Sequence, residues 1–258
     1  MNRIDQLFSR KEGEILSVYM TAGFPGLEDT PEMIRSLQDH GTDLVEIGIP
    51  FSDPLADGPV IQRSSQTALK NGISLGLLFE QLSGIRKGVK IPLILMGYLN
   101  PILRFGMERF LTACSETGID GAIIPDLPLD EYETSCTGLF KEHGIHHVLL
   151  ITPQTPSERI SRIVGLSDGF IYMVADASTT GAKDSIRQAQ IGYFRRILKM
   201  ELGRPALIGF GISNHQTFTT ACRYARGAII GSAFIRMLEE KGFSDQNVKS
   251  FLRSIRQG

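Results

Sequence analysis

The sequence lacks the features that mark several common classes of protein. It has three cysteines among 258 residues, Cys114, Cys136 and Cys222, with no CxxC pair and no histidine at metal-ligand spacing. Neither a disulfide framework nor a metal site is therefore indicated. A formal net charge of −1 and scattered Lys and Arg give no field that would gather nucleic acid or an anionic membrane. We expect no nucleic-acid partner, no metal and a reducing compartment, the cytoplasm.

Long apolar runs are also missing. No stretch approaches the ~20 apolar residues that cross a bilayer, and the first residues, MNRIDQLFSRKEGEI, have no apolar core of the signal-peptide kind. No Gly/Ser linker, low-complexity tract or shift in composition divides the chain. These absences predict a single domain over residues 1–258, with no membrane partner and no export.

What the sequence does contain is a repeated alternation of apolar runs and helical patterns. The first run, Ile15–Met20, ends in a Gly/Pro turn, and helical spacing follows over Pro31–His40. Seven more runs follow, at 44–49, 91–98, 121–125, 146–151, 169–174, 205–210 and 227–231. A helical pattern comes after each of them, the first of these within Ser64–Lys87. Residues 1–10 predict a short helix ahead of the first strand.

Eight strand–helix units in 258 residues give about 32 residues each (258 divided by 8), which fits a closed barrel. The runs are almost continuously apolar, as is typical of parallel strands covered on both faces. We therefore predict an α/β fold, a single (β/α)8 TIM barrel with a short N-terminal helix. An open doubly wound sheet stays possible from the pattern alone.

The most unusual stretch, LVEIGIPFSDPLADGP, follows the second run. Alternation along a strand puts Leu44, Glu46 and Gly48 on one face, so Glu46 points to an interior surface. A carboxylate there must find a partner or take a raised pKa. The structural alternative is an ion pair with a buried Arg or Lys.

The loop after this strand supplies a second carboxylate, Asp57. Its three prolines, Pro50, Pro54 and Pro59, stiffen the loop and argue against a helix in it. Asp57 lies where the chain would return over the strand end. Glu46 and Asp57 are therefore our candidate catalytic pair.

Glycine motifs after the last two strands predict a phosphate site. They are GFGIS at Gly209–Ser213 and GSAF at Gly231–Phe234, and glycines there let backbone amides approach an anion. Barrels commonly bind phosphate after strands seven and eight. Gly181, in the loop after strand six, could join them.

Together these motifs resemble the alpha subunit of tryptophan synthase over essentially the whole chain. The resemblance is carried by EIGIPFSDPLADGP, by IIPDLPLDE at Ile123–Glu131, by TTG at Thr179–Gly181, and by GFGIS and GSA. It implies a (β/α)8 barrel of tryptophan biosynthesis that cleaves indole-3-glycerol phosphate to indole and glyceraldehyde 3-phosphate. It also implies no cofactor in this chain and a beta subunit that holds pyridoxal phosphate, in an alpha-beta-beta-alpha complex.

The resemblance also implies roles for individual residues. Glu46 and Asp57 match the catalytic pair. The positions expected to bind substrate are aromatic residues around the indole and small residues around the phosphate: Tyr19, Tyr98, Tyr172, Thr180, Gly181, Phe210, Gly211, Gly231 and Ser232. The loops Pro50–Pro59 and Ala175–Ala189 are expected at the barrel mouth, where Asp53 and Pro54 would meet the beta subunit.

The chemistry of this reaction calls for two carboxylates with opposite properties. Breaking the carbon–carbon bond needs an electron sink, which indole becomes when its C3 is protonated. Glu46 with a raised pKa can give and take that proton. Asp57 has to stay ionised beside the indole N–H.

Two other functions stay open. Another phosphate-binding barrel enzyme, an isomerase or a synthase, would need a catalytic lysine or cysteine at a strand end. A non-catalytic regulatory subunit would have no use for both carboxylates.

Some residues depart from the family pattern or have an ambiguous role. Asp176 and Ser178 stand where the family often has Arg and Gly, and Arg226 stands where an acidic residue is frequent. We interpret Arg226 as a surface substitution. Asp126 is either a substrate contact or a loop cap, and the histidines at 146 and 147 are packed or solvated rather than catalytic.

Overall fold

The computed structural model describes residues 1–54, 57–175, 186–209 and 211–258, and its sheet pairings are parallel. Nine strands form one sheet within these residues, in the order β5-β4-β3-β2-β1-β9-β8-β7-β6. Their bounds are β1 Ile15–Thr21, β2 Leu44–Gly48, β3 Leu93–Met96, β4 Gly121–Ile123, β5 His146–His147, β6 Leu149–Ile151, β7 Ile171–Val174, β8 Ala206–Gly209 and β9 Gly227–Ile230.

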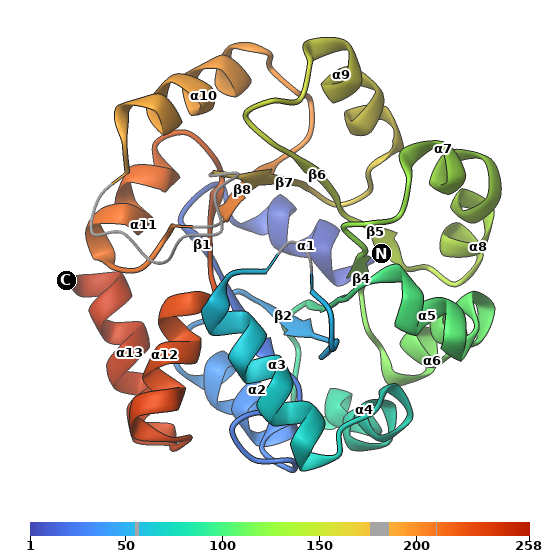
Figure 1. Cartoon of the computed structure of the whole chain (residues 1–258). Helices are drawn as coiled ribbons and strands as arrows, with labels where there is room; N and C mark the ends of the chain where they lie inside the picture. The colour runs from blue at the N-terminus through green and yellow to red at the C-terminus, as the bar shows by residue number, and fades with distance from the viewer. Residues whose placement is uncertain (55–56, 176–185, 210) are drawn as a thin grey trace.

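The two ends of that order, β5 and β6, are halves of one apolar run. Only Val148 separates them, and its N–H donates to the Ala122 carbonyl, 3.0 Å away, which continues the pairing with β4. β6 then pairs with β7. The predicted fifth strand is thus one strand that changes partner, and the sheet closes as the predicted barrel (Figure 1).

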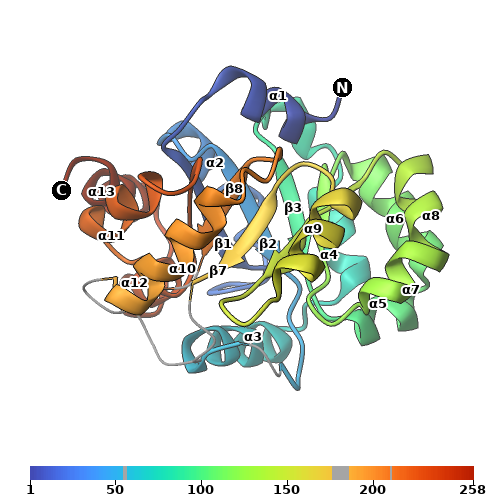
Figure 2. The same ribbon diagram turned by 90° about the horizontal axis from the view of Figure 1, so that it is seen from above.

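Helices surround the sheet in both ribbon views (Figures 1 and 2). Their bounds are α1 Arg3–Arg10, α2 Thr30–Asp39, α3 Pro59–Asn71, α4 Leu75–Leu82, α5 Leu99–Phe105, α6 Met107–Thr117, α7 Leu129–Glu131, α8 Thr137–Glu142, α9 Ser157–Leu166, α10 Gln188–Lys199, α11 His215–Cys222, α12 Ser232–Lys241 and α13 Asp245–Gln257. A 3-10 turn covers Ile85–Lys87 and a π turn covers Tyr132–Cys136. Among the described residues, no helix is both long and apolar enough to cross a membrane.

The loop after β2 is shorter in the structure than we predicted. We expected Pro59 to hold off a helix and the next helix to lie within Ser64–Lys87, but α3 begins at Pro59 itself. Proline suits the first helical position because its missing N–H would have no partner there and its φ is already helical. Asp57 therefore lies two residues before a helix rather than inside a long loop.

Two apolar layers confirm the alternation expected of the strands. The inner layer fills the barrel and contains Leu44, while the next residue, Val45, packs in the outer layer between strands and helices. Ile4 and Leu7 of the predicted N-terminal helix, α1, also belong to the inner layer. Helix α1 therefore plugs one end of the barrel, and α3 lies at the other end (Figure 2).

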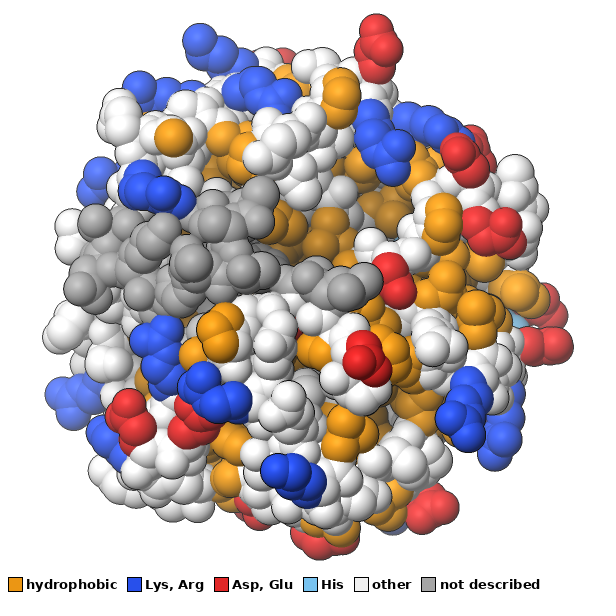
Figure 3. Space-filling view, viewed as in Figure 1, with side chains coloured by type: hydrophobic (Ala, Val, Ile, Leu, Met, Phe, Trp, Pro, Cys, Tyr) orange, Lys and Arg blue, Asp and Glu red, His pale blue; other side chains and the backbone are white. Residues whose placement is uncertain are grey.

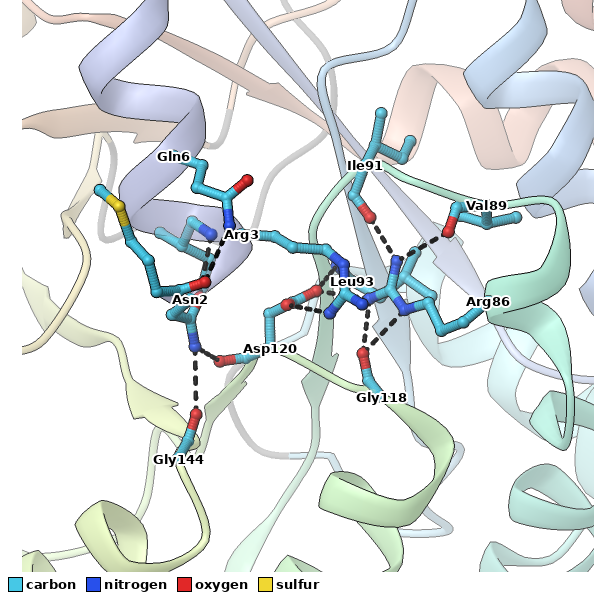
Figure 4. A network of polar contacts seen from close by, with 12 residues as sticks. Asn2, Arg3, Gln6, Arg86, Val89, Ile91, Leu93, Gly118, Asp120 and Gly144 are labelled. Atoms are coloured by element: carbon cyan, nitrogen blue, oxygen red, sulfur yellow. Dashed lines mark hydrogen bonds and ion pairs between the residues drawn. The ribbon is translucent and has the colours of Figure 1, made fainter.

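A buried carboxylate ties α1 to the plugged end. Asp120, which is 3% exposed, forms ion pairs with Arg3, 2.9 Å away, and with Arg86, and accepts the Leu93 N–H at 2.9 Å (Figure 4). Asn2 donates to its backbone carbonyl. We call the end of the barrel that α1 covers, where Asp120 makes these contacts, the closed end.

Arg226 also belongs to the closed end, which contradicts our interpretation of it as a surface substitution. It is half-buried, and its Nη2 donates to the carbonyls of Phe8, at 3.1 Å, and Lys11, at 2.7 Å. Arg226 thus binds one carbonyl of the last turn of α1 and that of the residue after the helix, where a cation is favoured.

Candidate functional site

Glu46 lies on the inner face of β2 and is fully buried. Its Oε1 accepts a hydrogen bond of 2.9 Å from the Ser17 hydroxyl, and its Oε2 finds no partner among the described residues. Burial raises the pKa of this carboxyl to about 8, and the Ser17 bond acts against that rise. The alternative of an ion pair with a buried Arg or Lys is wrong, because the described partner is a hydroxyl.

Asp57 is half-buried just before α3. The Tyr98 hydroxyl donates to its Oδ2 at 3.2 Å. Burial raises the pKa of the Asp57 carboxyl, while the bond from Tyr98 lowers it. Partial exposure distinguishes Asp57 from Glu46, in line with its predicted place on a polar loop. The phenol donor was not predicted.

Two tyrosines predicted to meet the indole lie beside these carboxylates. Tyr19 on β1 is in register with Glu46. Burial raises the pKa of the Tyr19 and Tyr172 phenols well above the ordinary value, and the charges of Glu46 and Asp57 add to this. The four residues therefore share one end of the barrel, which we call the open end.

Glycines make the room for both phenols. A Cβ added at Gly48 would lie 2.0 Å from the Tyr19 hydroxyl oxygen, and one at Gly209 would lie 2.3 Å from that of Tyr172. Any larger residue at either strand end would push a phenol out of place. The space-filling view shows apolar side chains in a hollow near the centre of this face (Figure 3).

The loop after β2 packs against the start of α5. The rings of Phe51 and Tyr98 lie 5.3 Å apart, and Asp126 Oδ1 accepts the Leu99 N–H at 2.8 Å. Of the two roles we considered for Asp126, a substrate contact or a loop cap, this bond to the start of α5 fits the loop cap. Asp53 is exposed, with a hydrogen bond of 2.5 Å from the hydroxyl of the neighbouring serine.

The glycine motifs differ in backbone conformation. Gly231, with φ −119°, precedes α12, which begins at Ser232 and has no side-chain cap among the described residues. The backbone N–H groups in the first turn of α12 therefore have no acceptor within the helix. Gly211 has φ +77° in the loop after β8. Thr180, Gly181 and Phe210 lie outside the described residues, as do Asp176 and Ser178.

Sequence reasoning missed two residues of the site. Ser17, the partner of Glu46, was readable only as a polar residue within the apolar run ILSVYM. Gln62 of α3 donates from Nε2 to the carbonyls of Asp57, at 2.9 Å, and Pro54, at 3.5 Å. Gln62 was hidden because we had placed the start of its helix too late.

Comparison with known proteins decides the family. The sequence model of the family described as "Tryptophan synthase alpha chain" matches residues 5–257. The chain belongs to the tryptophan synthase alpha chain family. A tryptophan synthase alpha chain of Flavobacterium psychrophilum is 53% identical over 255 residues, with 99% of this chain and 100% of that one covered. One from Christiangramia forsetii is 52% identical over 256 residues, with 99% of each covered.

Solved structures agree with this assignment. Tryptophan synthase subunit alpha of Legionella pneumophila superposes with a TM-score of 0.88 at 34% identity, covering 100% of this alpha chain and 98% of that one. A chain of the tryptophan synthase complex of Pyrococcus furiosus gives a TM-score of 0.86 at 33% identity, with 95% and 98% covered. The resemblance and the barrel fold predicted from the sequence are both confirmed.

Proposed function

We propose that this alpha chain cleaves indole-3-glycerol phosphate to indole and glyceraldehyde 3-phosphate, with Glu46 as acid and base and Asp57 as the anion beside the indole nitrogen. The observation that carries the proposal is the buried Glu46 carboxyl, whose raised pKa of about 8 and unpartnered Oε2 suit a group that exchanges a proton. Family membership makes the chain a carbon–carbon lyase.

The proton returns to Glu46 within one turnover. Neutral Glu46 protonates C3 of the indole, which leaves the ring as a cation with its charge at the nitrogen. The bond from C3 to the glycerol carbon then breaks, and its electron pair goes into the ring and restores a neutral indole. The hydroxyl on that glycerol carbon loses its proton to the Glu46 carboxylate and becomes the aldehyde. General acid–base catalysis of this kind contributes about 10²–10⁴-fold.

Asp57 has the complementary role. As an anion it accepts a hydrogen bond from the indole N–H and stabilises the positive charge that develops there, which is worth a few kcal/mol in a dry site. Tyr98 supports this role, because its hydroxyl donates to Oδ2 and so favours the ionised carboxylate. The phenols of Tyr19 and Tyr172 are assigned to the walls around the indole.

The phosphate is assigned to the start of α12. Gly231 has no side chain to block the approach, and the amides of Ser232 and the following residues face outward from the helix start with no side-chain cap. The positive end of the helix favours an anion. Gly211 is proposed as the second wall of this site.

The partner is a tryptophan synthase beta subunit. As a family member, the chain needs no cofactor of its own and works in an alpha-beta-beta-alpha complex whose beta subunit holds pyridoxal phosphate. We assign the contact to Asp53 and Pro54, which lie on the loop that carries Asp57. Docking there would set the position of Asp57, so the isolated chain should be slow. The location we propose is the cytoplasm.

The experiment is to measure indole released from indole-3-glycerol phosphate by the full chain, alone and with its cognate beta subunit. We expect slow release alone and faster release with the partner. Asp53→Lys should weaken that acceleration, whereas Glu142→Lys, a charge reversal on exposed α8, should not. No indole under either condition removes the lyase assignment. A chain that releases no indole but speeds the beta subunit's own reaction would instead be a regulatory subunit.

A further inference from the structure

Ser17 is a polar residue in a barrel interior that apolar side chains mostly fill. It lies on the inner face of β1 between Ile15 and Tyr19, and the register pairs Tyr19 with Glu46, so Ser17 is the diagonal neighbour of Glu46. The side chain is fully buried, and its hydroxyl donates to Glu46 Oε1 at 2.9 Å. An apolar residue here would leave both oxygens of the carboxyl without a described partner.

This bond makes the two carboxyl oxygens of Glu46 different. A hydroxyl that donates to Oε1 makes Oε1 the acceptor, so the acid proton of neutral Glu46 resides on Oε2. Oε2 is buried and has no partner among the described residues. It is therefore the oxygen that remains available to a substrate.

We propose that Ser17 is a positioning residue for Glu46: its hydroxyl holds Oε1 in place, so that Oε2 delivers the proton to the indole and takes it back. The inference rests on the proposed function of Glu46. Ser17 itself does not touch the substrate. It acts by fixing the rotation of the carboxyl group, which proton transfer requires to within a fraction of an ångström.

Electrostatics supports this role. Burial raises the pKa of Glu46 to about 8, and among the described residues Ser17 is the donor that opposes the rise, because it stabilises the ionised form. The other titratable groups around Glu46 are Tyr19 on β1, Tyr172 on β7 and Asp57 after β2. Both phenols stay neutral at working pH because burial raises their pKa values above the ordinary value of 10. The negative charge of Asp57 does not favour a negative charge on Glu46. Ser17 thus keeps Glu46 able to act as a base.

Two substitutions of almost equal shape isolate the hydroxyl. Ser17→Thr keeps it and Ser17→Val lacks it, so any steric effect of the added atoms is shared; Ser17→Ala is the smaller variant if both pack poorly. The measurement is indole release by the full chain with its beta subunit across pH. We expect Ser17→Thr to keep the wild-type profile. Ser17→Val should move the limb that reports Glu46 up by about one pH unit and lower turnover about tenfold, with KM nearly unchanged.

A titration without catalysis separates this inference from the proposed function. Carbon-13 NMR of the Glu46 carboxyl should give a pKa about one unit higher in Ser17→Val than in Ser17→Thr. Equal pKa values and equal pH profiles in the two variants would overturn the inference. An inactive wild-type chain would overturn the proposed function instead, and the titration would still decide whether the Ser17 bond exists.

Discussion

The closed and open ends of the barrel each bury a carboxylate, but they treat it in opposite ways. Asp120 at the closed end meets two arginines and a backbone N–H. Glu46 at the open end meets one hydroxyl and keeps an unpartnered oxygen. A buried charge without a counter-charge is costly, so a fold that only needed stability would avoid it. If Glu46 acts as proposed, pairing rather than burial distinguishes the structural carboxylate, Asp120, from the reactive one.

The largest expected effect is at the closed end. Asp120→Ala removes the shared partner of Arg3 and Arg86 and should lower the free energy of unfolding by about 4 kcal/mol, the range for breaking one side of a buried pair. Urea unfolding measures it. Asp5→Ala, which removes the more exposed ion pair with His146, is the matched control and should cost less than about 1 kcal/mol. Equal losses in the two variants would mean that Asp120 is no more important than a surface charge.

At the open end, Glu46→Gln should lower turnover by about 100-fold or more with the fold intact, because an amide cannot cycle a proton. Indole release with the beta subunit measures the loss. Asp57→Asn keeps the shape and loses the charge, and should also depress turnover. Near wild-type rates in both variants would refute the catalytic assignment.

The same Glu46→Gln change, which should lower turnover, should raise the stability of the fold relative to wild type at alkaline pH. The folded-state pKa of about 8 lies above the ordinary value of 4.5, so the folded chain holds an extra proton between these values. The stability contribution is present below pH 4.5 and is lost as pH rises through 8. The variant should therefore gain on the wild type as pH rises from 5 to 9, by a few kcal/mol, in urea unfolding at each pH. A constant difference would place the Glu46 pKa near its ordinary value.

His147 sharpens the comparison, because it is buried without a described partner yet lies outside the site. It packs against Tyr132 and Phe140, with ring centroids 4.2 and 5.0 Å away. Burial lowers its pKa from 6.5 to about 3, so it is neutral at working pH and its cost appears only in acid.

The unfolded chain binds a proton at His147 between these two pKa values, so stability is lost as pH falls below 6.5. His147→Leu should remove that loss. The stability of the variant relative to wild type should shift by about 2 kcal/mol between pH 8 and pH 5, measured by urea unfolding.

The smallest effect concerns the glycines of the open end. Gly211→Ala should cost about 1 kcal/mol, because φ is +77° and an L-residue is strained there. Gly231→Ala should change stability by less than about 0.5 kcal/mol, since φ is −119° and the new Cβ would lie 3.4 Å from that of Tyr19. Thermal unfolding measures both. Of these two glycines, only Gly231 can be replaced without the backbone strain that a positive φ causes. Phosphate binding is therefore tested at Gly231, by replacing it with valine and titrating the variant with glycerol phosphate.

The sequence was enough to predict what depends on local periodicity. The alternation in β2 placed Glu46 inside, and the strand–helix rhythm predicted the barrel. It could not reveal contacts between segments far apart in the chain. The Ser17–Glu46 bond depends on strand register, and the Arg226 contacts depend on how the closed end meets α1. The boundary at Pro59 failed for a local reason, because proline both ends loops and starts helices.

The change of partner in the fifth strand has a consequence for solubility. An open sheet of nine strands would present two edges whose unpaired N–H and C=O groups can template the addition of a strand from another molecule. Here the edges are β5 and β6, which continue one another through the buried Val148. The Val148 amide is taken by Ala122. Along the described strands the barrel therefore offers no free edge, and its resistance to edge-to-edge aggregation comes from one strand that serves two neighbours in turn.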